Sequence, residues 1–304
     1  MKILFMGTTD FAVACLDAMR GAGYEAAAVC TKADRPKNRG MKLAFSPVKE
    51  YALAAELPVL QPESLKTSET LEALRAVGAD LFVVVAYGKL LPKQVLELPR
   101  LGCINVHGSL LPRYRGAAPI QWAVMNGEAE TGVSVMYLSE EMDAGDVIST
   151  ASAPIGREES FGSVYERMKA LGGRLLADTL PLIERGEARA VPQDGSAATY
   201  APPIMKEHTL IDWSLPAAAI RSRICGLDPK PGARAHVAGT EFKVFAPEET
   251  GKRSELPPGS VAGTGKDGIE LVCGDGETLL IRELQAPGGK RMRAADWLRG
   301  HKLP

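Results

Sequence analysis

The chain has 304 residues, which is long for one typical domain and predicts two. Hydrophobic residues make up 45% and charged residues 24%, the balance of a globular protein that can bury a full core. The formal net charge is −1, so the composition excludes a strongly basic protein, and binding of a nucleic acid would need a local basic patch.

The cysteine and histidine positions give no sign of a metal site or a disulfide framework. Five cysteines are scattered without a CxxC pair, which is typical of a reducing compartment. His208, His236 and His301 lack the spacing of metal ligands, so no metal is expected. Met1 leads directly into a strand-like segment, and no apolar run approaches the roughly 18 residues that span a membrane. We therefore expect a soluble, cytoplasmic protein without a membrane partner.

The first half of the chain alternates between strand and helix patterns. Residues 3–6 are apolar, Gly7 follows as a turn, and a periodic helix is expected from Phe11 to about Arg20. Only one glycine of a GxGxxG pattern is present, which argues against a dinucleotide site. Further strands are expected over 24–30, 80–86, 103–107 and 132–138, and helices over 48–55, 65–77, 119–125 and 160–184. This order predicts a Rossmann-like doubly wound α/β domain, with its binding crevice at the strand carboxyl ends.

Residues 32–47 interrupt this alternation with a basic segment. Five basic residues meet a single acid there, and Pro36 and Gly40 predict a loop without regular structure. One interpretation is a solvated loop without a partner. The other is a loop whose Arg and Lys side chains neutralise a nucleic-acid backbone.

The second half of the chain has a different pattern. Residues 189–206 are rich in Pro, Gly and Ser and are interpreted as a linker between domains at 1–188 and 207–304. Short alternating strands over 235–237, 241–245, 268–273 and 278–285, separated by turn residues, predict a small β-barrel. Lys290 and Arg291 lie in a compact basic turn, which is either a solvated surface turn or a phosphate contact.

Two polar residues stand out in the apolar segment 103–107. Asn105 and His107 are two positions apart, which places both side chains on one face of a strand, about 6.6 Å from each other. An amide can donate to a developing oxyanion, and an imidazole can move a proton, so the pair suits transfer of an acyl-type group. Alternatively, both residues are core polar groups whose partners are backbone atoms.

The same region carries a family resemblance. The stretch NVHGSLLPRYRGAAP over 105–119, with ETG at 130–132 and MDAGD at 142–146, resembles the formyltransferase family that uses 10-formyltetrahydrofolate. The resemblance extends from residue 1 to about residue 301. It implies Asn105, His107 and Asp143 as the catalytic residues, and a C-terminal domain that is an OB-like barrel. From the residues alone, Asp143 could also be a turn-forming residue before Gly145.

The resemblance also implies where the formyl donor binds. In the family, tetrahydrofolate occupies the loop that corresponds here to Ser109, Leu110, Leu111 and Pro112. We expect Val85 and Tyr87, at the end of a neighbouring strand, to help form this site. Taken alone, the loop could be only a rigid turn before a helix.

The function that the resemblance implies is formylation of the methionine carried by initiator methionyl-tRNA. We expect the enzyme to be a monomer. In the family, the basic insertion contacts the tRNA acceptor arm, and its pattern places the key arginine at Arg39, with Lys37 and Lys42 meeting phosphates. An enzyme that formylates a small amine, such as glycinamide ribonucleotide or an amino-sugar nucleotide, would share the three polar residues. A non-catalytic RNA-binding module is the alternative from another class.

Overall fold

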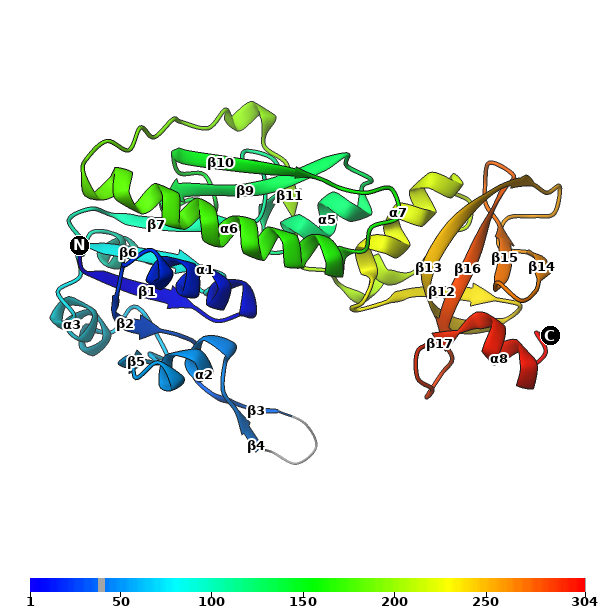
Figure 1. The fold of residues 1–304 in the computed structure, drawn as a ribbon, viewed down its shortest axis with the longest axis horizontal. Coiled ribbons are helices and arrows are strands. Elements are labelled where there is room, and N and C mark those ends of the chain that lie inside the picture. Colours follow the sequence, from blue (N-terminus) through cyan, green and yellow to red (C-terminus); the bar gives the residue numbers. More distant parts are fainter. Residues whose placement is uncertain (38–41, 304) are drawn as a thin grey trace. The chain divides into compact units, whose positions relative to one another are not determined.

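The computed structural model describes residues 1–37 and 42–303, which form two compact units (Figure 1). The first unit consists of Met1–Gly116, Gly132–Ser152 and Arg167–Tyr200. The second consists of Ala117–Thr131, Ala153–Glu166 and Ala201–Pro304. The described helices include none that is long and apolar enough to cross a membrane.

A seven-stranded sheet forms the centre of the first unit, in the order β10-β9-β7-β6-β1-β2-β5. The strands are β1 Ile3–Gly7, β2 Ala26–Cys30, β5 Val59–Leu60, β6 Leu81–Val85, β7 Cys103–His107, β9 Glu130–Tyr137 and β10 Val147–Pro154. β1 runs parallel to β2 and β6, and β7 runs parallel to β6 but antiparallel to β9. The chain therefore leaves β1 first toward one edge and later toward the other, as the doubly wound prediction requires.

Helices cover both faces of this sheet. They are α1 Asp10–Gly21, α2 Pro47–Ala54, α3 Ser68–Ala76, α4 Lys93–Leu96 and α6 Phe161–Glu184. On one face, Gly172 of α6 lets the helix approach Phe11 of α1 and Val106 of β7, since a Cβ there would lie 3.1 and 3.4 Å from them. On the other face, Leu74 of α3 and Val95 of α4 share a core with Cys103. Because side chains alternate along β7, Asn105 and His107 point to the same side as Cys103.

Most of the predicted elements of this unit are confirmed, whereas β5 and β10 of its seven-stranded sheet were not predicted. The helix predicted over 160–184 is α6, and the one predicted over 119–125 is α5 Pro119–Met125, which belongs to the second unit. β5 has only two residues, too few to give a pattern. β10 was not predicted because it has the sequence VISTASAP, whose small and polar residues alternate between partly buried and exposed at a sheet edge.

The basic insertion contains a two-stranded antiparallel sheet. β3 Arg35–Lys37 pairs with β4 Lys42–Ala44, and Lys37 lies opposite Lys42 in the register. The prediction that this segment lacks regular structure was therefore wrong for residues 35–37 and 42–44, whereas Gly40 lies outside the described residues. A two-stranded ribbon consists of edges only, so a proline that lacks the backbone N–H is tolerated in it.

A polar cluster holds the base of this hairpin. Lys49 in α2 forms an ion pair with Asp34, and Gln61 Nε2 donates to Asp34 Oδ1 at 2.9 Å and to the carbonyl of Lys32 at 2.9 Å. The bonds from Lys49 and Gln61 hold the pKa of the Asp34 carboxyl below its usual range. The carboxylate is therefore charged at neutral pH, and its pairing is lost only as the pH falls through that lowered pKa.

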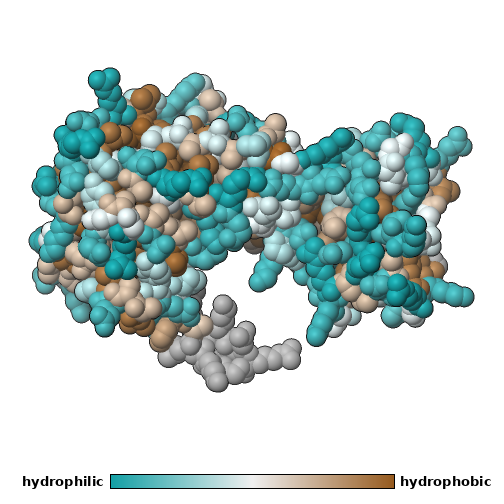
Figure 2. Space-filling model, viewed as in Figure 1, coloured by the Kyte–Doolittle hydropathy of each residue, from teal (hydrophilic) through white to brown (hydrophobic). Residues whose placement is uncertain are grey.

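The second unit contains an antiparallel sheet in the order β12-β13-β16-β15-β14, with β17 paired to β16. The strands are β12 Ala233–Val237, β13 Thr240–Arg253, β14 Val261–Thr264, β15 Ile269–Val272, β16 Glu277–Gln285 and β17 Met292–Arg293. The four predicted strands are confirmed, whereas closure into a barrel is not shown, because β12 and β14 are the two ends of the order. Helix α7 Ala217–Leu227 packs its Ile220 and Ile224 into the core of this sheet, and α8 Ala294–Gly300 follows β17. Hydrophilic side chains cover most of the visible face of this unit (Figure 2).

The segment predicted to be a linker is bonded to its neighbours. Val191 exchanges backbone hydrogen bonds with Val147 at 2.9 Å, and the Arg115 N–H donates to the Thr199 carbonyl at 2.8 Å. β8 Arg115–Gly116 and β11 Tyr200–Ala201 form a two-stranded sheet, and short 3-10 helices follow over Gly195–Ala197 and Lys206–Thr209. Residues 191–199 are therefore attached to the first unit.

Candidate active site

β7 places the amide of Asn105 at the centre of the sheet. Asn105 lies between Val84 of β6 and Met136 of β9 in the strand register, so its backbone is fixed on both sides. Its side chain is half-buried, and among the residues that the structure describes it has no hydrogen-bond partner. The amide N–H groups are therefore available to an incoming oxygen atom.

His107 ends the same strand and is buried, with both ring nitrogens facing oxygen atoms. Nε2 lies 2.9 Å from the carbonyl oxygen of Tyr114. Since a carbonyl can only accept, we assign the proton of the neutral ring to Nε2. Nδ1 lies 3.6 Å from Asp143 Oδ2. Nδ1 can thus take up a proton, and the resulting imidazolium would face a carboxylate.

Asp143 reaches this position from the loop 139–146, between β9 and β10. Its φ is +52°, a left-handed conformation that is uncommon for a residue other than glycine. The Gly116 N–H donates to Asp143 Oδ2 at 2.8 Å. Gly145 passes so close to β9 that a Cβ there would lie 1.9 Å from the Tyr137 carbonyl oxygen. The loop is thus folded tightly against the sheet, with the carboxylate directed at His107.

The predicted folate loop is held by Ser134 of β9. Ser134 Oγ donates to the Ser109 carbonyl at 2.7 Å and accepts from the Leu111 N–H at 3.2 Å. Ser109 Oγ donates to the Arg113 carbonyl at 2.6 Å, which closes the loop on itself. Leu110 packs over Gly132, where a Cβ would come within 2.5 Å of its Cδ2. Leu110, Leu111 and Pro112 remain half-buried, whereas Ser109 is buried.

Val85 and Tyr87, the other two predicted folate contacts, are both buried in the first unit. The Tyr87 hydroxyl lies 3.4 Å from Cys30 Sγ, so the ring extends toward β2 inside the core. Burial raises the pKa of the Tyr87 hydroxyl, and it raises the pKa of the Cys30 thiol to about 11, so both groups stay protonated at neutral pH. A contact of these two residues with folate stays a prediction.

Two side chains near Asp143 were not predicted from the sequence. Arg115 is buried beside the site, and Gln193 bonds both to Arg115 and to the loop that carries Asp143. Gln193 was overlooked because it lies between Pro192 and Gly195, in a segment interpreted as a linker. The residues that follow Gln193 are polar and include a glycine, which is also typical of an exposed linker. Nothing in the sequence therefore marked Gln193 as part of a site.

The structure describes some of the residues predicted to contact tRNA in more detail than others. Arg39 lies outside the described residues, and Lys37 and Lys42 are placed by the backbone pairing of β3 with β4. Lys290 is exposed. The Arg291 guanidinium bonds to Asp228 at 2.6 and 3.0 Å, pairs with Glu283, and lies 4.1 Å from the Phe245 ring centroid. The charge of Arg291 is therefore balanced inside the second unit.

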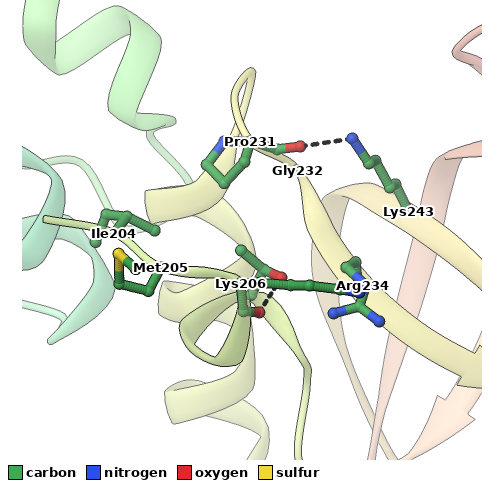
Figure 3. Close-up of a pocket in the computed structure, with 8 residues that line it drawn as sticks. Ile204, Met205, Lys206, Pro231, Gly232, Arg234 and Lys243 are labelled. Atoms are coloured by element: carbon green, nitrogen blue, oxygen red, sulfur yellow. Dashed lines mark hydrogen bonds between the residues drawn. The ribbon is translucent and has the colours of Figure 1, made fainter.

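The second unit contains a shallow pocket of about 190 Å³ (Figure 3). Lys243 Nζ donates to the Pro231 carbonyl at 2.8 Å across it, and Arg234 pairs with Glu241. None of the predicted site residues lines this pocket. Its lining consists of Ile204, Met205, Lys206, Thr209, Pro231, Gly232, Arg234 and Lys243.

Comparison with known families places both halves of the chain in one family. The family described as formyl transferase matches residues 1–180, and its C-terminal domain matches residues 203–302. The chain therefore belongs to the formyltransferase family, and the predicted resemblance is confirmed. It is 46% identical over 303 residues to the methionyl-tRNA formyltransferase of Moorella thermoacetica, covering 100% of this chain and 97% of that protein. The methionyl-tRNA formyltransferase of Myxococcus xanthus is 45% identical, covering 99% of this chain and 96% of that protein.

Solved structures share the fold at low sequence identity. WlaRD, a sugar 3N-formyl transferase, matches with a TM-score of 0.70 and 17% identity, covering 92% of this chain and 97% of its own. HypX from Aquifex aeolicus, solved with tetrahydrofolic acid, matches with a TM-score of 0.63 and 20% identity, covering 98% of this chain and 47% of its own. At these identities the likeness supports the fold alone.

Proposed function

We propose that this chain transfers the formyl group of 10-formyltetrahydrofolate to the α-amino group of methionine on initiator methionyl-tRNA. The relatives that carry this activity in their names are about 45% identical to the chain over nearly its whole length. The observation that supports the chemistry is the 3.6 Å approach of the Asp143 carboxylate to the His107 imidazole, with the amide of Asn105 two residues earlier on the same face of β7. Such an arrangement suits transfer of an acyl-type group to an amine.

The reaction follows from the positions of these three side chains. The amine nitrogen attacks the formyl carbon, and the formyl oxygen becomes an oxyanion that accepts a hydrogen bond from the Asn105 amide. His107 takes the amine proton at Nδ1, while the carboxylate of Asp143 stabilises the imidazolium. The bond from the formyl carbon to the folate N10 then breaks, and N10 receives the proton from the imidazolium. The products are the formylated amine and tetrahydrofolate, and the three side chains are unchanged.

We assign the formyl donor to the loop of Ser109, Leu110, Leu111 and Pro112, with Val85 and Tyr87 behind it. The support is the fixed backbone of this loop, which Ser134 holds at two points. A fixed loop can present its carbonyl oxygens and the N–H groups of Ser109 and Leu110 to the polar edge of a pterin, and its leucines can cover the flat ring. The donor is a substrate here and does not remain on the protein.

The tRNA is assigned to the basic insertion and to the second unit. Arg39, Lys37 and Lys42 would meet the acceptor arm, and Lys290 a phosphate; Arg291, with its charge already balanced, would contribute less. We also propose that the antiparallel sheet of residues 207–304 is an OB-like barrel that positions the tRNA, and that residues 1–188 contain the catalytic residues. We further propose that the enzyme acts as a cytoplasmic monomer. A substrate as small as glycinamide ribonucleotide needs neither the insertion nor the second unit.

The deciding experiment is an assay with labelled 10-formyltetrahydrofolate and several acceptors. We expect label in the methionine of charged initiator tRNA, and none in glycinamide ribonucleotide, an amino-sugar nucleotide or free methionine. Label in a small amine alone would assign the chain to a small-amine formyltransferase. Binding of the tRNA without any transfer would identify a non-catalytic RNA-binding module.

The Arg39→Ala variant should lose discrimination between tRNAs. If Arg39 makes a base-edge or stacking contact in the acceptor stem, we expect the preference for initiator over elongator methionyl-tRNA to fall by about 1–3 kcal/mol. Lys37→Ala should instead weaken both tRNAs alike and reduce the salt slope of binding by about one, as expected for a phosphate contact. The measurement is kcat/KM for the two tRNAs at several salt concentrations.

Lys66→Ala is the matched control, because Lys66 is an exposed lysine of the first unit outside the insertion. It should leave both the preference and the salt slope unchanged. Equal losses on both tRNAs for Arg39→Ala would reduce the insertion to a charged patch, and no loss on either would make it a solvated hairpin.

A further inference from the structure

The side-chain amide of Gln193 connects two parts of the first unit through four hydrogen bonds to Arg115 and two loop carbonyls, and its Nε2 also lies 3.9 Å from Met136 Sδ. Its Oε1 accepts from Arg115 Nε at 3.1 Å and from Arg115 Nη2 at 2.8 Å. Its Nε2 donates to the carbonyl of Asp143 at 2.9 Å and to that of Gly145 at 2.7 Å. A guanidinium can only donate and a carbonyl can only accept, so the orientation of this amide is fixed by its partners.

Arg115 holds the side chain of Gln193 in a fixed position. Its side chain is 7% exposed, and its backbone N–H donates to the Thr199 carbonyl. The next residue, Gly116, donates its own N–H to Asp143 Oδ2. Residues 115 and 116 therefore hold the Asp143 loop at two places, at the carboxylate directly and at the backbone through Gln193.

The backbone of Asp143 needs such support. A residue other than glycine in the left-handed region is strained by about 1–3 kcal/mol and stays there only when its surroundings hold it. The two bonds from Gln193 fix the carbonyls on either side of Ala144, which sets the direction of the Asp143 side chain. Without them, the loop would keep the Gly116 N–H bond to the carboxylate and the Tyr137 N–H bond to the Asp146 carbonyl, neither of which holds the carbonyls of Asp143 and Gly145.

We propose that Gln193 is a positioning residue for the reaction, which holds the Asp143 carboxylate against His107 by binding the carbonyls of Asp143 and Gly145. This inference rests on the proposed function, because it assigns Asp143 its part in proton transfer. Gln193 acts through Asp143 and does not itself touch the substrate.

The Gln193→Glu variant separates this role from a merely structural one. The glutamate keeps two oxygen acceptors for Arg115, so the anchor of the 191–199 segment is retained and gains a charge pair. It has no N–H to donate, and its carboxylate repels the two loop carbonyls. We expect kcat to fall by about 10- to 100-fold, in the range that a small misplacement of a catalytic group produces. The KM values for 10-formyltetrahydrofolate and for methionyl-tRNA should stay within about twofold.

Asp194→Asn is the matched control, since Asp194 is the next residue, is exposed, and its side chain bonds only to Ser196 within the described chain. It should leave kcat and both KM values unchanged. Thermal melting of each variant checks that the fold is retained. Wild-type kcat in Gln193→Glu would overturn the inference, since it would show that Gln193 serves only to bind Arg115.

A double-mutant cycle with Asp143→Asn completes the test. If Gln193 acts through Asp143, adding Gln193→Glu to Asp143→Asn should lower kcat by less than about twofold further. Fully additive losses would contradict the inference, because Gln193 would then act independently of Asp143. Full activity of Asp143→Asn alone would instead refute the proposed catalytic role of Asp143, so the two failures are distinguishable.

Discussion

Replacing Asn105 by alanine is expected to lower kcat by about 100- to 1000-fold while the KM for 10-formyltetrahydrofolate changes little. The reason is that an oxyanion exists only in and near the transition state, so its donor contributes little to substrate binding. The strand register places Asn105 between β6 and β9, which fixes the direction of its side chain. Because that side chain is half-buried, its removal opens no large cavity in the core.

Single-turnover rates and folate affinity measured on the same variant test this expectation. Asn105→Asp provides the matched comparison, since it keeps the volume and removes the N–H donors. Asn105→Asp should lose at least as much turnover as Asn105→Ala. Both variants should melt close to the wild-type temperature. Retained turnover with weakened folate binding would make Asn105 a ground-state ligand of the folate.

The second large effect is expected for Asp143→Asn, where kcat should fall by about 100-fold or more, as when a carboxylate that orients a catalytic histidine is neutralised. The asparagine carbonyl oxygen can still accept from the Gly116 N–H, so the loop remains in place. The same oxygen position faces Nδ1 of His107, so a neutral amide oxygen replaces the carboxylate beside the imidazole. A neutral oxygen stabilises an imidazolium less than a carboxylate does, so Nδ1 takes the proton of the attacking amine less readily.

Rates measured across pH distinguish this from a structural effect of the loop. Glu141→Gln removes a charge from the same loop at an exposed position and should leave the rate unchanged. Near-wild-type rates of Asp143→Asn over the whole pH range would remove Asp143 from the mechanism and leave it as a loop residue.

The sequence predicts the parts of this molecule that depend on local patterns. The period of apolar residues predicted the central strands and α6, and the spacing of Asn105 and His107 placed both on one face of β7. The pairing of β3 with β4 escaped prediction because each strand has only three residues, and neither contains a β-branched or aromatic residue. The attachment of Gln193 could not be predicted, since it joins residues 50 and 78 positions apart and depends on backbone carbonyls that any sequence possesses.

The bonds that enclose residues 109–116 have a thermodynamic consequence for ligand binding. The N–H groups of Leu111, Tyr114, Arg115 and Gly116 are all occupied before any ligand arrives, by Ser134, Thr199 and Asp143. A ligand that settles on this loop therefore meets a preorganised surface, and little conformational entropy of the backbone is lost on association. Binding energy from the contacts is therefore not spent on ordering the loop. Ligands are discriminated by how well their shape fits a surface that is already formed.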